Sequence, residues 1–503
     1  MSGIVIEIGV TFLLFFAPFA FGGVELWAKG VVQIITGVVV AAWLLGSRRH
    51  RERGVPLGRA RTAALGVPIG LFLLLVFVQL LPLSPAWMAR LAPGTHDLYE
   101  RALPGYAQGR PFQSADLVPW LLADHAGATG AGSVLSPPEP ASLPSLFPTS
   151  APVNRPLSIY PAQTRDRLTQ LLCWVGLFAV VAGHYVTPER RMRLLATAVF
   201  SGLAVSIVGI IQQLTWNGKL LWIREGNYLG VFGPFVNRNS YAAFAGTLVP
   251  VALALALEAA GRADRRRGET LPRVVLWSFT AMAIWGGVFL SLSRGGILTT
   301  GLSILAMLLF LLAYSRSRRT FELIVLGGVV LFCVGFVVWI GPGEVVERLG
   351  TLREGQNVPT FAHRWKAWAR MLPMIDNHQA LGTGLGTFRF AFMRFAPPAE
   401  GWWTTAHNEY VEVVTDTGVV GALLVATGLA AYLLIVVRPR LRDHGDRYLY
   451  AGMAAGLAGL LIHSIANSSL QVPANGLLVA VLGALLLRLV VDRGARRRPG
   501  PTP

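Results

Sequence analysis

The sequence predicts an all-α polytopic membrane protein, on two observations. Of its 503 residues, 53% are hydrophobic and only 14% are charged, whereas roughly a quarter of the residues in a soluble domain are charged. Apolar runs of about 20 residues, the length that crosses roughly 30 Å of hydrocarbon, also recur along the chain. The mean hydropathy of +0.53 agrees with this class. A chain with this composition is not expected to fold as a soluble domain.

About twelve of these runs are predicted to span the membrane, three of them in 1–82, six in 169–340 and three in 418–503. The predicted spans are 4–21, 28–46, 64–82, 169–186, 194–213, 240–259, 274–292, 296–314, 323–340, 418–437, 450–466 and 476–491. Because their number is even, both chain ends are expected on the same side of the membrane. The first run has no Lys or Arg before it and no small-residue cleavage site after it, so we expect it to be a retained helix.

The basic residues predict which side is cytoplasmic. More than half of the 44 Lys and Arg residues lie in alternate connections, among them "SRRHRERGVPLGRAR", "GRADRRRGETLPR" and "RPRLRDHGDR", and in the chain end "RGARRRPGPTP". The positive-inside rule assigns these segments, and with them both termini, to the cytoplasm. The net charge of +18 therefore reflects topology, and the absence of a compact basic domain argues against a nucleic-acid partner. The two cysteines, Cys173 and Cys333, fall inside predicted spans, so the sequence suggests neither a disulfide framework nor a thiolate metal site.

Two long segments are predicted on the outward side, at 83–168 and 341–417. The first contains "GATGAGSVLSPPEPASLPSLFPTSAP", which is too poor in large apolar residues to order itself. We expect a flexible excursion there, with short helices on either side. The second segment carries aromatic and basic residues together with "TTAHNEYVEVVTDTGVVG", so it is the expected site of the chemistry.

A helix along the membrane interface is predicted by "PTFAHRWKAWARMLPMI" in the second long segment. Its aromatic and apolar residues recur near helical spacing, whereas its basic residues fall on other faces. The apolar set is Phe361, Trp365, Trp368 and Leu372, and the basic set is His363, Arg364, Lys366 and Arg370. Either the segment is a simple interfacial anchor, or Arg364 or Arg370 binds an anion.

The stretch "TTAHNEYVEVV" predicts the start of another helix. Thr405 is a good N-cap, which would put His407 in the first turn, where the helix N-terminus disfavours a protonated imidazole. A neutral His407 could act as a general base or as a donor to an anion. Alternatively, His407 and Asn408 merely cap the helix. Glu409 could orient His407 or pair with an arginine, or it could be solvated together with Glu412.

Two further arginines lie at predicted outward ends of spans. Arg238 is flanked by Asn237 and Asn239 in "GVFGPFVNRNSYAAF", and Arg294 joins two spans in "SLSRGGILTT". An arginine at such depth is costly unless it meets an anion or a carboxylate, although Arg294 could also snorkel or fix a tight turn. His463, within a predicted span, is either a relay group or a structural hydrogen-bonding residue.

The gathered arginines predict an anionic ligand. Guanidinium groups suit phosphate oxygens, so the expected ligand is a lipid headgroup such as a diphosphate, presented from the outer leaflet. The sequence has no Asp-x-Asp motif to hold a metal. Fixed cations would then neutralise the leaving diphosphate, and neither a divalent metal nor another cofactor is expected.

In this order, "VFGPFVNRNSYAA", "SLSRGG", "HRWKAW", "ALGTGLGTF" and "HNEYVEVVTDTGVVG" resemble motifs of the bacterial O-antigen ligase and O-antigen polymerase superfamily. The resemblance covers most of the chain from about Tyr160 onward. It implies an inner-membrane glycosyltransferase with a glycosyltransferase C-like helical fold, acting in lipopolysaccharide or exopolysaccharide biosynthesis. The donor would be a glycan on undecaprenyl diphosphate, and the acceptor would be the lipid A core or a lipid-linked repeat unit.

The resemblance also assigns roles to residues. Arg294 and Arg364 would grip the diphosphate, and His407 would orient or deprotonate the acceptor hydroxyl. The further candidates for substrate binding are Arg238, Asn237, Asn239, Asn408, Glu409, His363 and Arg370. "PLSIYPAQTRDRL" and "IHSIANSSLQVPANGLL" are similar to segments of polymerase-like members, but the second has Asn467 where an aspartate is expected.

Two other functions remain open at this point. A lipid-linked oligosaccharide flippase or another transporter would also need cations for an anionic headgroup, but its polar groups usually extend through the membrane midplane. Here they gather on one side, which favours chemistry there. A protein O-oligosaccharyltransferase would share the motifs and differ in its acceptor, and a chain-length regulator is a possible partner of a polymerase.

Overall fold

The computed structural model describes residues 2–50, 58–103, 106, 112–113, 150–151, 154–225, 230–261, 267–314, 327–328, 331, 335, 361–396, 403–437 and 444–495. In this part of the chain, ten helices are long and apolar enough to cross a membrane. They confirm the predicted all-α polytopic class. The ten are α1 Ser2–Phe19, α2 Leu26–His50, α3 Arg59–Gln79, α7 Pro161–His184, α8 Pro188–Leu214, α9 Arg238–Gly261, α10 Arg267–Leu290, α11 Arg294–Tyr314, α16 Glu409–Val436 and α18 Pro473–Ala495.

Two of the twelve predicted spans are not among the ten. The run 450–466 corresponds to α17, His444–His463, whose polar residues include Asp446 and Arg447 near its start. The run 323–340 lies outside the described residues except for isolated positions. α7 begins eight residues before the predicted span, at Pro161, because proline suits the first turn of a helix.

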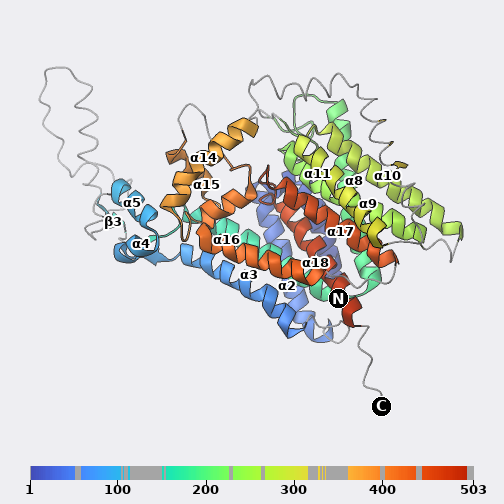
Figure 1. Cartoon of the computed structure of the whole chain (residues 1–503), viewed down its shortest axis with the longest axis horizontal. Helices are drawn as coiled ribbons and strands as arrows, with labels where there is room; N and C mark the ends of the chain where they lie inside the picture. Colours follow the sequence, from blue (N-terminus) through green and yellow to red (C-terminus); the bar gives the residue numbers. More distant parts are fainter. Residues whose placement is uncertain are drawn as a thin grey trace, which may run out of the picture.

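The helices pack around α9, which is buried along the whole of its membrane-spanning length. α8, α10, α11 and α17 surround it. In contrast, α16 packs along α3 at the edge of the bundle and exposes Leu423 and Leu434, as a lipid-facing helix does (Figure 1). The helices around α9 therefore form the core of the molecule. α16 is an outer helix, and one of its ends reaches this core.

The described parts of the two long segments form one layer at the end of the bundle where α16 begins (Figure 1). In the first segment, β1 Pro82–Leu83 pairs antiparallel with β4 Arg155–Pro156, and α4 Pro85–Leu91 and α5 Pro93–Ala102 follow β1. A second short pair joins β2 Phe112–Gln113 to β3 Ser150–Ala151. The predicted flexible middle of this segment lies outside the described residues.

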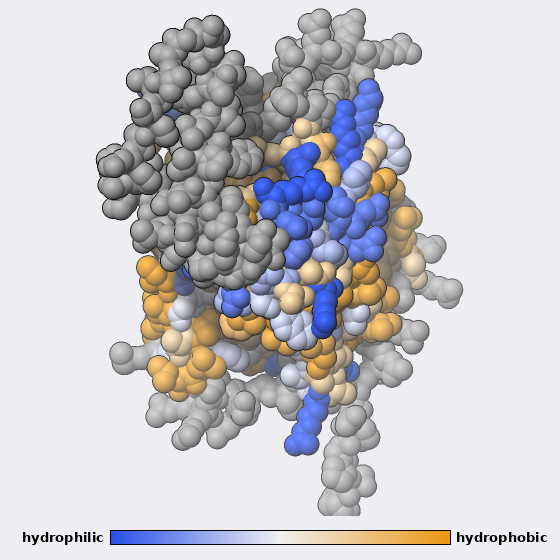
Figure 2. Space-filling model, turned by 90° about the vertical axis from the view of Figure 1, so that its left-hand side faces the viewer, coloured by the Kyte–Doolittle hydropathy of each residue, from blue (hydrophilic) through white to orange (hydrophobic). Residues whose placement is uncertain are grey.

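The second segment contributes α14 Phe361–Asn377, α15 Phe388–Ala391 and the 3-10 turn η4 Phe392–Arg394. α14 contacts α5, and Arg394 forms an ion pair of 3.2 Å with Asp97 of α5. Figure 2, which looks onto this side of the molecule, shows hydrophilic residues gathered mostly above the hydrophobic ones. The packing of α14 on α5 and the ion pair between Arg394 and Asp97 therefore join the two long segments.

A loop of glycines is inserted into a break in α16. Gly418 has φ 65° and ψ −173°, a conformation that is essentially restricted to glycine. A Cβ atom at Gly418 would lie 2.3 Å from the carbonyl oxygen of Ala380, and one at Gly382 would lie 2.3 Å from the carbonyl carbon of Asp416. This close approach explains Gly382 of "ALGTGLGTF", because a side chain there would push the loop away from the helix.

Gln79, the last residue of α3, holds the same loop from the other side. Its side-chain amide donates to the carbonyl oxygens of Leu381 at 2.7 Å and Asp416 at 3.0 Å, and its oxygen accepts the N–H of Leu385 at 3.0 Å. The nitrogen and the oxygen of the Gln79 side chain are thus both hydrogen-bonded to backbone atoms of the loop and of α16, as a fully buried amide requires. This end of α16 is fixed by α3 and by the second long segment together.

Candidate active site

The start of α16 differs from the prediction. Its N-cap is Asn408, whose side-chain oxygen accepts the N–H groups of Tyr410 at 3.0 Å and Val411 at 3.2 Å. The expectation that Thr405 caps the helix and that His407 lies in its first turn is therefore wrong. His407 instead precedes the cap with φ 50°, in the left-handed region that a non-glycine residue adopts at a cost.

The neutral form of His407 is favoured by its surroundings and not by a helix terminus. Burial and the nearby positive charge of Arg364 lower its pKa to about 4, whereas a hydrogen bond between His407 and the side chain of Asn467 acts to raise it. The Nδ1 atom of His407 is buried and has no hydrogen-bond partner in the described part of the chain. The ring of Trp403 lies edge-on at 5.9 Å between centroids. The imidazole is therefore hydrogen-bonded to Asn467, and its Nδ1 atom is available to bind a ligand.

Arg364 ties α14 to the loop that carries Asn467. Its Nη1 atom donates to the carbonyl oxygen of Ala466 at 2.5 Å. One turn further along α14, the indole of Trp368 donates to the carbonyl oxygen of Ala406 at 2.8 Å. α14 thus holds the residues directly before both His407 and Asn467.

The other predicted residues of α14 do not share this position. Arg370 follows Arg364 by six residues, which corresponds to about 240° around a helix, so the two arginines face different sides. His363 belongs to the first turn of α14, and its side chain is outside the described part. The predicted apolar face is only partly correct, because Trp365 and Leu372 are exposed. The face that packs inward consists of Ala367, Met371 and Met374.

The structure brings the two other arginine motifs together at the same end of the bundle. Arg238 begins α9 and Arg294 begins α11. The two helix starts are joined by a hydrogen bond of 2.8 Å from the hydroxyl of Ser293 to the side chain of Asn239. The side chain of Arg294 is exposed. Asn237 caps locally, since its side-chain oxygen accepts the N–H of Asn239 at 2.8 Å.

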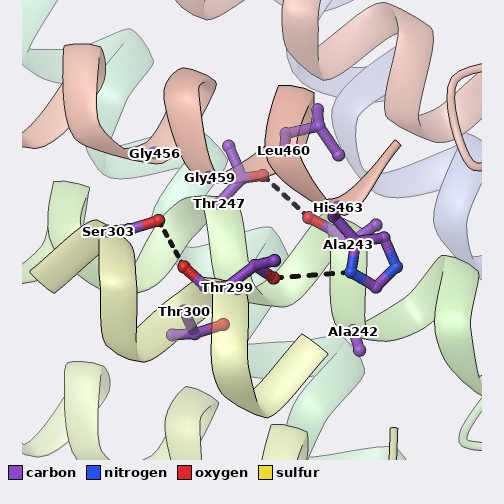
Figure 3. Close-up of a pocket in the computed structure, with 11 residues that line it drawn as sticks. Ala242, Ala243, Thr247, Thr299, Thr300, Ser303, Gly456, Gly459, Leu460 and His463 are labelled. Carbon is purple, nitrogen blue, oxygen red and sulfur yellow. Dashed lines mark hydrogen bonds between the residues drawn. The ribbon is translucent and has the colours of Figure 1, made fainter. Parts of the chain in front are cut away.

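His463 lies against the start of α11. Its buried ring lies 3.4 Å from the hydroxyl of Thr299, measured at Nδ1, and a Cβ atom at Gly295 would lie 3.3 Å from it (Figure 3). The positive charge of Arg364 also acts on it. His463 lines a small pocket among α9, α11 and α17 with hydroxyl side chains (Figure 3). Arg364 therefore acts electrostatically on both His407 and His463, and His463 lies against the first turns of α11.

Behind His407, three carboxylates of α16 face Arg167 of α7. Glu409, Glu412 and Asp416 all interact electrostatically with this arginine. Glu412 and Asp416 are buried, so the alternative of a solvated carboxylate is wrong for Glu412. The guanidinium group of Arg167 is further held by Gln471, at 2.8 Å from the side-chain oxygen and 3.1 Å from the backbone oxygen. Glu409 thus has a cationic partner, but it is not one of the predicted arginines.

Several residues of this site were missed by sequence reasoning. Arg167 lies in "PLSIYPAQTRDRL" and Gln471 in "IHSIANSSLQVPANGLL", so both segments were noted without these positions being singled out. Asn467 was noted only as a departure from an expected aspartate, and the structure puts it against His407. In the described part of the chain, no group of three or more His, Cys, Asp or Glu residues is placed to hold a metal ion.

The fold and this geometry define a polytopic membrane protein with a histidine and arginine site at one end of its helix bundle. Residues 279–426 match the family model described as O-antigen ligase. The match extends from α10 into α16 and includes Arg294, Arg364 and His407. No curated protein matches the chain. The chain carries a domain of the O-antigen ligase and polymerase superfamily, and the resemblance is confirmed. This domain supports a membrane glycosyltransferase of the ligase or polymerase type.

Proposed function

We propose that the protein transfers a glycan from undecaprenyl diphosphate to an acceptor hydroxyl at the outer face of the bacterial inner membrane, without a metal ion. The acceptor is the lipid A core or a second lipid-linked repeat unit. The observation that carries this proposal is the imidazole of His407, whose buried Nδ1 atom has no hydrogen-bond partner among the described residues and whose pKa is lowered by burial and by the positive charge of Arg364. A base or orienting group next to a phosphate-binding cation is what glycosyl transfer from a diphosphate needs.

In the proposed reaction, the acceptor oxygen attacks the anomeric carbon while the bond from that carbon to the diphosphate oxygen breaks. The hydroxyl proton is taken up at Nδ1 of His407 or passes to solvent while His407 orients the hydroxyl. The charge that develops on the diphosphate is neutralised by Arg364 and Arg294, with Arg238 as a further ligand. The exposure of Arg294 at a helix start supports this role, because its guanidinium is accessible to a headgroup.

The proposal is tested in membranes supplied with lipid-linked repeat units, with glycans resolved by chain length in the presence and absence of lipid A core. We expect His407→Ala to lower kcat by about 10² to 10⁴, the usual contribution of a positioned acid or base. Arg294→Ala and Arg364→Ala should lower kcat to a comparable extent. Arg193→Ala, at the other end of the bundle, should not lower kcat. A wild-type ladder on the carrier lipid indicates a polymerase, and single transfer to the core indicates a ligase.

Two results would overturn the proposal. If His407→Ala and Arg294→Ala both retain full activity at normal expression, the chemistry is elsewhere. If donor lipids cross the membrane with no new glycosidic bond, the protein is a flippase. Transfer to a protein hydroxyl would keep the mechanism and change the acceptor.

Metal independence is tested separately, by measuring transfer activity in the presence of EDTA. Because the proposed charge neutralisation uses guanidinium groups, we expect activity to survive EDTA and subsequent addition of Mg²⁺ or Mn²⁺ to change it little. Strong inhibition by EDTA that is reversed by a divalent ion contradicts this part of the mechanism.

A further inference from the structure

Glu412 lies between the two loops that carry His407 and Asn467. It belongs to the first turn of α16 and only 4% of its surface is exposed. One of its carboxylate oxygens, Oε2, accepts the backbone N–H of Ala406 at 3.2 Å and the hydroxyl of Ser468 at 2.7 Å. A single buried atom therefore bonds to both loops.

The two donors are the immediate neighbours of the His407 and Asn467 pair. Ala406 directly precedes His407, and Ser468 directly follows Asn467. The side chain of Gln471 provides a further hydrogen bond to Glu412. Because two hydrogen bonds from different loops meet at one oxygen atom, this arrangement restrains the separation between the two loops.

His407 needs such a restraint more than an ordinary residue does. Its φ of 50° is unfavourable for a side chain with a Cβ atom, and such conformations persist only where the surroundings over-determine them. Asn408 fixes the following residues by capping α16, and Trp368 fixes the carbonyl side of Ala406. Glu412 fixes the N–H side of Ala406 and, through Ser468, is one of the contacts that reach across to the Asn467 loop.

We propose that Glu412 is a positioning residue that holds His407 against Asn467 by bonding the backbone of Ala406 and the hydroxyl of Ser468 with one carboxylate oxygen. The inference rests on the proposed role of His407 in glycosyl transfer. Glu412 itself does not touch the substrate, so its loss should misalign the imidazole without removing the cations that bind the diphosphate. The effect should appear in kcat and leave the KM for the donor lipid nearly unchanged.

The experiment measures kcat and KM for the lipid-linked donor in Glu412→Ala, Glu412→Gln, Ser468→Ala and their wild-type parent. We expect Glu412→Ala to lower kcat at least about tenfold, with the KM within about threefold. Glu412→Gln should recover most of kcat, because an amide oxygen can accept the same two hydrogen bonds. Ser468→Ala should lower kcat by about threefold, and the double variant Glu412→Ala, Ser468→Ala should be no slower than Glu412→Ala alone.

Ser464→Ala is the matched control for Ser468→Ala. Ser464 is buried in the same loop, but its hydroxyl donates to Leu460 of its own helix at 2.9 Å. Its removal should leave kcat unchanged. If Glu412→Ala fails to fold, the comparison of Ser468→Ala with Ser464→Ala still decides the question, and equal kcat values for these two variants overturn the inference.

The same assay separates this inference from the proposed function. If His407→Ala is inactive but Glu412→Ala keeps the wild-type kcat, Glu412 is not a positioning residue and the proposed function stands. If His407→Ala is fully active, the proposed function itself fails. Equal losses in Glu412→Gln and Glu412→Ala, or a loss confined to KM, also contradict positioning through these two hydrogen bonds.

Discussion

At the scale of single residues, the electrostatics of His407 couple it to the charge state of the donor site. Burial and the cation Arg364 both oppose protonation, which leaves the pKa at about 4 in the free protein. A bound diphosphate would bring negative charge next to Arg364 and offset its effect on the imidazole. His407 would then become a better proton acceptor once the donor is bound. The acid limb of kcat should therefore lie at a higher pH than the acid limb of kcat/KM.

Asn467→Asp tests this account of His407. A carboxylate in place of the amide favours the imidazolium, so the pKa of His407 should rise from about 4. Because the neutral imidazole is the proposed active form, activity present above the pKa should be lost as the pH falls, and the acid limb of kcat/KM should move to higher pH. Asn217→Asp, at an exposed position, is the control and should not move it. A limb that stays in place or moves to lower pH in Asn467→Asp contradicts the electrostatic explanation.

Sequence reasoning found His407, Arg364 and Arg294 because each lies in a short local motif. It misplaced the helix cap because Thr405 and Asn408 are both good capping residues, and only the bonds to Tyr410 and Val411 distinguish them. It missed Arg167 as a partner of the α16 carboxylates because that contact joins segments far apart in the chain. Tertiary contacts of this kind leave no periodic pattern in the sequence.

At the scale of elements, the break in α16 is what lets the second long segment dock. The N–H groups of Val419 and Val420 bond to the carbonyl oxygens of Gln379 at 2.8 Å and Ala380 at 3.3 Å instead of continuing the helix. The sequence predicted a span that starts at residue 418, because the apolar run begins there, whereas the helix starts at Glu409. Hydropathy locates the part of a helix that faces lipid, but not the polar first turns that face a protein site.

Gly418→Ala should destabilise this junction. Its φ of 65° with ψ of −173° costs a residue with a Cβ atom about 1 to 3 kcal/mol, and the added Cβ would also meet the carbonyl oxygen of Ala380 at 2.3 Å. We expect a lower unfolding temperature in detergent and a loss of transfer activity.

Gly428→Ala is the matched control in the same helix, since its nearest contact would be an ordinary 3.5 Å from Pro68. It should be neutral or slightly stabilising, because alanine favours a helix more than glycine does. Equal unfolding temperatures for Gly418→Ala and Gly428→Ala would show that the loop tolerates displacement from α16.

At the scale of the whole molecule, the site is built where many helix ends meet. The starts of α9, α11, α16 and α18 and the ends of α3 and α17 lie at one end of the bundle, together with both long segments (Figure 1). The alternation of basic connections predicts this end to be extracytoplasmic. Composition and charge pattern are global properties that a sequence displays directly, so they predicted the fold class well. The packing order of the helices had no comparable signal.

The predicted orientation is tested by labelling single cysteines with a membrane-impermeant maleimide. The chain has only Cys173 and Cys333, so replacing both by serine gives a clean background. Thr404→Cys lies in the exposed stretch before His407, and Arg193→Cys replaces a side chain that is 61% exposed at the opposite end of the bundle. Because the donor diphosphate is proposed to reach the site from the outer leaflet, right-side-out spheroplasts should label Thr404→Cys, and Arg193→Cys should react only after permeabilisation. The reverse pattern would invert the topology and put the arginine site on the cytoplasmic side, where the proposed donor is not presented.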